Sequence, residues 1–117
     1  MRSVLEEKSF NFAIRIVKLY KYLTESKKEY VIAKQLLRSG TSVGANVSEA
    51  QFAQTKADFG TKMHIALKEA GETRYWIRLL KESDYLTEEE SKSILSDCAE
   101  LISMLVSTCK TTLPRES

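Results

Sequence analysis

Apolar residues recur along most of the chain at alternating spacings of three and four, which is the period of a helix with one buried face. The clearest run comprises Phe59, Met63, Ala66, Ala70, Thr73, Ile77 and Leu80. A later run has the same spacing and comprises Leu95, Cys98, Ile102, Leu105 and Cys109. β-Branched residues form no alternating strand pattern. The pattern therefore predicts four helices, over residues 9–25, 29–53, 56–82 and 88–111.

Candidate helix caps separate these four segments. Ser9 is a candidate N-cap for the first helix, and residues 26–29 have the spacing of a capping box for the second. Thr55 and Thr87 precede the third and fourth helices, and each has an acidic residue in the turn that follows. Short connections favour antiparallel neighbours. We therefore expect residues 1–117 to form a single all-α domain, an antiparallel up-down-up-down four-helix bundle.

The second predicted helix contains two glycines, Gly40 and Gly44. Two glycines inside a helix cost roughly 2 kcal/mol relative to alanine, so another interaction must favour them. Because residues four apart share a helix face, the pair predicts a close contact with a crossing helix. Residues 40–44 also fit the G-x-S-x-G pattern of hydrolases. That motif requires a strand before Ser42, whereas the flanking residues have helical period.

Polar residues follow another side of the same helix. In an antiparallel hairpin, residues equally distant from the turn lie at the same height, which places Arg38 level with Glu72 and Glu49 level with Lys62. We expect at least one of Arg38, Asn46 and Glu49 to be buried and hydrogen-bonded to the third helix or to another chain; the alternative is an exposed polar stripe. The predicted polar seam comprises Arg38, Ser39, Ser42, Asn46, Glu49 and Glu72.

The first predicted helix is apolar over more of its surface than a single core requires. Its polar residues fall in one stripe, which comprises Asn11, Arg15, Lys18, Lys21 and Glu25. A helix that packs against one core needs a narrower apolar face. The surplus predicts a second buried surface, which in a small protein favours self-association. Phe12 and Tyr22 are the candidate interface residues.

Charge is nearly balanced overall, at +2, but it is unevenly distributed. Residues 1–38 contain nine Lys and Arg against four Asp and Glu, whereas residues 83–117 contain three against seven. A balanced chain provides no strong global field for nucleic acid or membranes. Its basic part still supplies a candidate nucleic-acid-binding face, which comprises Arg15, Lys18, Lys21, Lys27 and Lys28. The alternative interpretation is solvated helix faces of different sign.

Residues suited to catalysis or metal binding are sparse. His64 is the only histidine, and Glu69 and Glu72 have a spacing more typical of surface ion pairs than of a catalytic dyad. Cys98 and Cys109 lie about 16 Å apart along one helix, too far for a disulfide. We therefore expect no catalytic residue, no metal and no cofactor. No segment approaches the roughly 20 apolar residues of a membrane span, which predicts a cytoplasmic protein without a membrane partner.

Several motifs match a known family; they are SFNFAIRI (9–16), QLLRSGTSVGANVSEA (35–50), KADF (56–59), IALKEA (65–70) and ETRYW (72–76). They closely resemble bacterial four-helix-bundle proteins encoded in ribosomal RNA intervening sequences. The resemblance covers nearly the whole chain in register and implies a four-helix bundle that assembles into a homopentameric ring. A related protein, the accessory variability determinant of diversity-generating retroelements, is a basic pentamer that binds nucleic acid and a reverse transcriptase. The present chain is far less basic.

Two functions are compatible with this sequence. The first is a non-enzymatic accessory factor that associates with structured RNA or the ribosome through phosphate contacts of the basic face, without base-specific readout. The second is an oligomeric scaffold that presents a surface to a protein partner and binds no nucleic acid. An enzyme ranks third, because no acid, base and nucleophile converge at a recognisable spacing.

Overall fold

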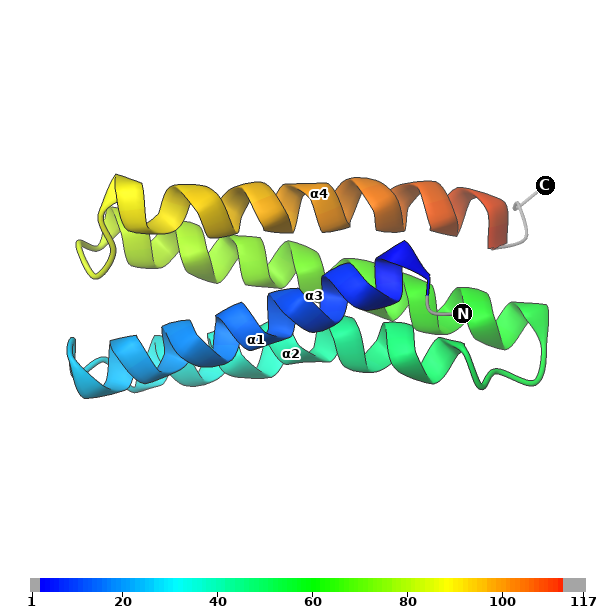
Figure 1. Cartoon of the computed structure of the whole chain (residues 1–117), viewed down its shortest axis with the longest axis horizontal. Helices are drawn as coiled ribbons and strands as arrows, with labels where there is room; N and C mark the ends of the chain where they lie inside the picture. Colours follow the sequence, from blue (N-terminus) through cyan, green and yellow to red (C-terminus); the bar gives the residue numbers. More distant parts are fainter. Residues whose placement is uncertain (1–2, 113–117) are drawn as a thin grey trace.

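The computed structural model describes residues 3–112, which form four helices joined by short turns (Figure 1). Helix α1 spans Val4–Glu25, α2 spans Val31–Ala50, α3 spans Lys56–Glu82 and α4 spans Glu88–Thr112. Successive helices run in opposite directions and pack against one another, and α4 returns beside α1. The predicted all-α, up-down-up-down four-helix bundle is therefore confirmed, and residues 3–112 contain no strand.

The structure corrects the predicted start of α1. The helix begins at Val4, because Ser3 and Glu6 form a capping box in which each side chain bonds the other residue's backbone N–H at 3.1 Å. Ser9 is not the N-cap. It lies buried inside the helix, and its hydroxyl donates a hydrogen bond to the Glu6 carbonyl.

The start and end of α2 also differ from the prediction. The chain turns at Lys28, whose φ of 57° is left-handed, and residues 26–29 do not form a capping box. Glu29 instead accepts a hydrogen bond of 2.8 Å from the backbone N–H of Ala33, which satisfies one free donor of the first turn. The helix ends at Ala50 rather than at residue 53, and a short turn leads to α3.

The other two helices begin as predicted. Thr55 accepts a hydrogen bond from the backbone N–H of Asp58 at 3.0 Å, which caps α3. Thr87 and Glu90 bond each other's backbone N–H groups at 3.0 and 2.8 Å, which caps α4. These two local signals therefore fix the helix starts correctly.

The core lies along the axis of the bundle and receives one face of every helix. The predicted face of α3 is buried except for the half-buried Phe59. The buried face of α4 shares Cys98 and Leu105 with the prediction. Its other apolar members are Ile94 and Leu101, whereas Leu95, Ile102 and Cys109 are half-buried.

Helix α1 crosses α2 at the two glycines. A Cβ at Gly40 would lie 2.7 Å from Ile16 side-chain atoms, and a Cβ at Gly44 would lie 3.0 Å from the Ser9 backbone oxygen. Both separations are shorter than ordinary van der Waals contact, so a Cβ at either position would require its neighbour to move, and at Gly44 that neighbour is backbone. The close helix contact predicted from Gly40 and Gly44 is therefore with α1.

Candidate functional site

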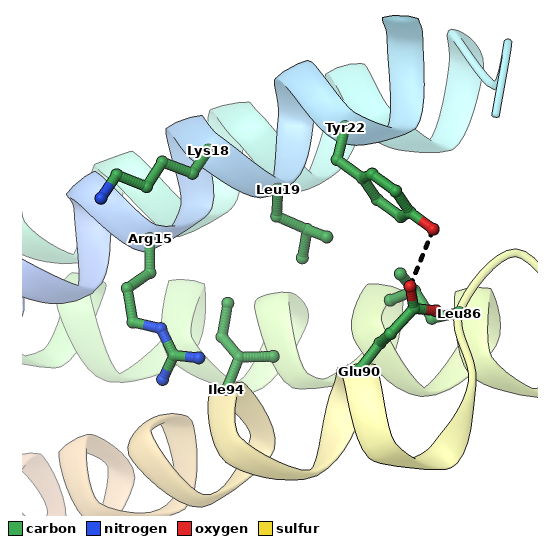
Figure 2. Close-up of a pocket in the computed structure, with 7 residues that line it drawn as sticks. All are labelled: Arg15, Lys18, Leu19, Tyr22, Leu86, Glu90 and Ile94. Carbon is green, nitrogen blue, oxygen red and sulfur yellow. Dashed lines mark hydrogen bonds between the residues drawn. The ribbon is translucent and has the colours of Figure 1, made fainter. Parts of the chain in front are cut away.

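A groove of about 400 Å³ lies between α1 and α4, the pair of neighbouring helices that pack least closely (Figure 2). In Figure 1, the distance between the α1 and α4 ribbons increases toward the C-terminal end of α1. The residues that line the groove come from the second half of α1, the start of α4 and the turn before α4. Its lining comprises Arg15, Lys18, Leu19, Tyr22, Leu86, Glu90 and Ile94.

Helical spacing brings the lining residues together. Those from α1 lie three and four positions apart and therefore share one side of the helix. Glu90 and Ile94 are one turn apart on α4, and Leu86 lies in the turn before it. Leu86 and Ile94 are buried and Leu19 is half-buried. The groove consequently has an apolar base and polar ends.

One end of the groove is a hydrogen-bonded pair. The Tyr22 hydroxyl donates to the Glu90 carboxylate at 2.7 Å, which raises the pKa of Tyr22 (Figure 2). The backbone N–H of Thr87 donates to the same carboxylate, and this bond, together with that from Tyr22, lowers the pKa of Glu90. The ammonium group of Lys27 lies 5.8 Å from the centroid of the Tyr22 ring, within reach of a cation–π contact.

Two cations form the other end. The Arg15 guanidinium donates to Asp97 at 2.5 Å and to Ser93 at 3.1 Å, so α4 already occupies it. In Figure 2, Arg15 points toward α4, whereas Lys18 lies along α1 with its ammonium group directed away from Leu19. Lys18 makes no ion pair with any residue of the described chain, 3–112. Of the charged groups in the lining, Lys18 is therefore the one free to meet a ligand.

Ion pairs between α1 and α4 join cations of the basic first part of the sequence to acids of its acidic last part. Lys8 pairs with Glu100 at 3.0 Å, and Arg15 pairs with Asp97. Both pairs are largely exposed, so each contributes only about 0 to 1 kcal/mol to stability. Their consequence is electrostatic, because the pair with Asp97 neutralises Arg15, one member of the predicted basic face. Within residues 3–112, the cations left exposed and without an acidic partner from that face are Lys18, Lys21, Lys27 and Lys28.

The surplus apolar surface of α1 lies outside the bundle. Phe10, Ile14 and Val17 are 58%, 41% and 38% exposed and follow one another at spacings of four and three. We call these three residues the α1 stripe. Phe12, a predicted interface residue, is only 2% exposed and belongs to the core, because it shares the buried face of Ile16; that prediction is corrected. Tyr22, the other candidate, is half-buried at the groove.

The predicted polar seam pairs with α3 as expected but is not buried as expected. Arg38 bonds both Glu69 and Glu72, and Glu49 pairs with Lys62 at 3.0 Å, in the predicted register. The side chains of Arg38 and Glu49 are 47% and 60% exposed, however, so the burial part of the prediction is wrong for both. The Arg38 contacts raise its pKa.

Shorter side chains make the buried polar contact between α2 and α3. Thr73 donates to Ser39 at 2.9 Å, and both residues are 0% exposed. Asn46 is half-buried and bonds the Ser42 carbonyl of its own helix. Side chains as long as Arg38 reach over the outside of the helix pair, whereas serine and threonine fit between the helices, which explains why the buried contact is Ser39–Thr73.

The metal-ligating and nucleophilic side chains bear on the predicted absence of catalytic and metal sites, which stays a prediction. Among residues 3–112, no three His, Cys, Asp or Glu side chains gather as metal ligands would. Burial raises the pKa of the Cys98 thiol to about 11, which keeps it protonated and unreactive at neutral pH. None of the four helices combines the length and apolar character that a membrane crossing demands.

Comparison with known proteins identifies the family. The family model described as 23S rRNA-intervening sequence protein matches residues 3–107, nearly the whole chain. The chain belongs to this family. The chain is similar to a protein of unknown function from the S23 ribosomal protein family of Bacteroides thetaiotaomicron VPI-5482, whose crystal structure is known. The two sequences are 53% identical. The alignment covers 92% of the present chain and 100% of that chain, with a TM-score of 0.91. No curated protein matches.

Membership of the 23S rRNA-intervening sequence protein family explains the resemblance of the motifs, but no sequence pattern predicts the groove residues that α4 and the turn before it supply. Leu86, Glu90 and Ile94 reach Tyr22 and Leu19 only through the tertiary arrangement, and no local motif marks them. The α1 stripe could have been found. Phe10, Ile14 and Val17 share a helical face opposite to that of Phe12 and Ile16, a distinction that helical spacing contains.

Proposed function

We propose that the protein is a non-catalytic, homo-oligomeric adapter of the cytoplasm that associates with structured RNA through phosphate contacts. The observation that carries the proposal is the division of α1 into a buried apolar face and an exposed α1 stripe of Phe10, Ile14 and Val17. A contiguous exposed apolar surface on a small protein favours a protein–protein contact, and the commonest such partner is another copy.

Features beside the α1 stripe support self-association. A hollow of about 300 Å³, lined by Glu6, Phe10, Gly44 and Ser48, adjoins it where α1 crosses α2. Protruding aromatic side chains and adjacent hollows are the components of complementary interfaces. The proposed assembly is a closed ring of five copies, as the family resemblance implies. Light scattering that gave the mass of one 13.3 kDa chain at micromolar concentration would contradict self-association.

Lysines without acidic partners support the RNA association. Lys18, Lys21, Lys27 and Lys28 lie in the second half of α1 and in the turn that follows it, exposed to solvent. Lysines of this kind bind phosphates as point charges and carry no base specificity. Repetition around a ring multiplies a weak site into appreciable avidity.

The test is binding of a labelled RNA hairpin as a function of salt. Affinity should fall steeply between about 50 and about 200 mM salt. A triple Lys18→Gln, Lys21→Gln, Lys28→Gln variant should lower the slope of log K against log salt by about three. A matched variant changes three exposed lysines elsewhere to glutamine, namely Lys56, Lys68 and Lys110. Equal losses in the two variants would indicate a nonspecific effect of charge and would contradict the proposed face.

A scaffold without nucleic-acid binding is the second candidate. It is favoured by the pairing of Lys8 with Glu100 and of Arg15 with Asp97, which neutralises part of the basic surface within the chain. Complete absence of RNA binding at low salt by an intact oligomer would select this function. The two candidates share the oligomer and differ only in the partner.

A further inference from the structure

We infer that the groove between α1 and α4 is a binding site for a short segment of a partner protein that presents one large apolar side chain next to a carboxylate. Leu19, Leu86 and Ile94 would receive the apolar side chain, and Lys18 would pair with the carboxylate. This site is distinct from the α1 stripe, so the inference does not depend on the oligomer. It shares Lys18 with the proposed RNA-binding face, and the peptide and RNA arms of the experiment below distinguish the two.

The shape and lining of the groove account for the apolar part of this segment. Its volume of about 400 Å³ is within the range of small ligand sites, and the base is formed by Leu86, Ile94 and Leu19. The groove exists because α1 and α4 diverge at this end of the bundle, which prevents these side chains from closing over one another. An inserted side chain would complete the packing that α1 and α4 leave incomplete.

The charges around the groove account for the acidic part. Two carboxylates lie at or beside the groove. Asp97 pairs with Arg15, whereas Glu90 accepts hydrogen bonds only from the neutral donors of Tyr22 and Thr87, and the cation that acts on its charge is Lys27. The cations are not all engaged, since Lys18 has no acidic partner within residues 3–112. With Lys27, which lies over the Tyr22 ring beside Glu90, three cations face two carboxylates, and the positive charge without a counterpart is that of Lys18. Complementarity therefore favours an anionic segment. A basic segment would meet Lys18 and Arg15 with no free carboxylate to compensate.

The experiment uses the full chain, labelled at Ile and Leu methyl groups so that NMR reports on a monomer or a ring alike. The probes are blocked tetrapeptides: Glu-Leu-Phe-Glu, its basic counterpart Lys-Leu-Phe-Lys, and the apolar-free Glu-Ser-Ser-Glu. We expect the acidic apolar peptide to shift the methyl signals of Leu19, Leu86 and Ile94 and to leave the signal of the core residue Ile77 unchanged. The other two peptides should produce no saturable shift.

Two variants test whether the charge of Lys18 contributes to the affinity for the peptide. Lys18→Gln should weaken binding of Glu-Leu-Phe-Glu about two- to fivefold, the range that one exposed ion pair provides. The matched Lys68→Gln, on the exposed side of α3, should leave the affinity unchanged. The inference fails if the acidic apolar peptide shifts none of the three groove methyls at millimolar concentration, or if Lys68→Gln weakens binding as much as Lys18→Gln. It is also overturned if an RNA hairpin shifts these methyls and the peptide does not, which would assign the groove to nucleic acid.

Discussion

The two sides of α1 are built differently, although the same helix supplies both. Toward α2, the helices approach until Gly44 faces the backbone oxygen of Ser9, which would lie 3.0 Å from an added Cβ and would have to move to admit one. Toward α4, the helices diverge, and long polar side chains such as Arg15 and Tyr22 bridge the gap. The first contact is close and depends on residue size, whereas the second is loose, polar and open to solvent.

This difference indicates a division of roles within the bundle. A contact that relies on backbone approach fixes the position of α1 and tolerates no larger residue. The opposite contact relies on exposed ion pairs and a hydrogen bond, which contribute little to stability and can be rearranged. The side of α1 whose contacts contribute less to stability is therefore the side where a binding groove can exist.

The strongest test of this comparison is Gly44→Leu. Leucine has the higher helix propensity, so an exposed site would gain stability. At Gly44 the new Cβ would lie 3.0 Å from the Ser9 oxygen, and the helices would have to separate, which should lower the free energy of unfolding by about 1 to 3 kcal/mol. The matched change is Gly71→Leu, where nothing lies within 4 Å of an added Cβ and stability should rise. Denaturant unfolding measures both, and an unchanged or raised stability of Gly44→Leu would refute the close contact.

The next test concerns the outward side of α1. Phe10→Glu places a charge in the α1 stripe and should convert the proposed oligomer into smaller species, because a buried unpaired carboxylate is costly in an interface. The matched change is Tyr75→Glu on α3, where the original side chain is 57% exposed, against 58% for Phe10. Multi-angle light scattering measures the mass of each. If Tyr75→Glu dissociated the proposed oligomer and Phe10→Glu did not, the interface would lie on α3 and not on α1.

How much of this arrangement was predictable depends on how local its signals are. The buried face of α3 and the caps at Thr55 and Thr87 follow from residues within one or two turns, and the sequence predicts them correctly. The glycine pair predicts that a helix approaches closely, but not that this helix is α1. Identification of the neighbour requires the fold, because many pairings of four amphipathic helices satisfy the same pattern.

The candidate site was less predictable for the same reason. Sequence alone brings Arg15, Lys18 and Tyr22 to one side of a helix, but nothing in it places Glu90 or Asp97 opposite them. The basic face therefore looked more strongly charged in the sequence than it is in the fold. A prediction from spacing counts each cation as free, whereas long-range pairing across the bundle decides which ones are.

The smallest expected effect on stability comes from a change at the loose contact between α1 and α4. The bond tested is the hydrogen bond that Tyr22 donates to Glu90. The pKa of Glu90 is lowered in the fold, so its contribution to stability is present above the ordinary value near 4.5 and is lost as the pH falls through the lower folded value. Glu90→Gln removes the charge and should cost about 0.3 to 1 kcal/mol at neutral pH, the range for an acid in the first turn of a helix.

Its neighbour provides the control for that change. Glu89→Gln alters the same helix dipole interaction, and no described side chain bonds Glu89, so the excess loss in Glu90→Gln reports the contacts with Tyr22 and Thr87. Thermal melts of both variants across acid and neutral pH measure this excess. It should be present at neutral pH and vanish at acid pH, where Glu90 is protonated in the folded protein. An excess that persists unchanged into acid would show that the α1–α4 contact does not depend on this charge, and that the contrast with the α1–α2 contact lies in packing alone.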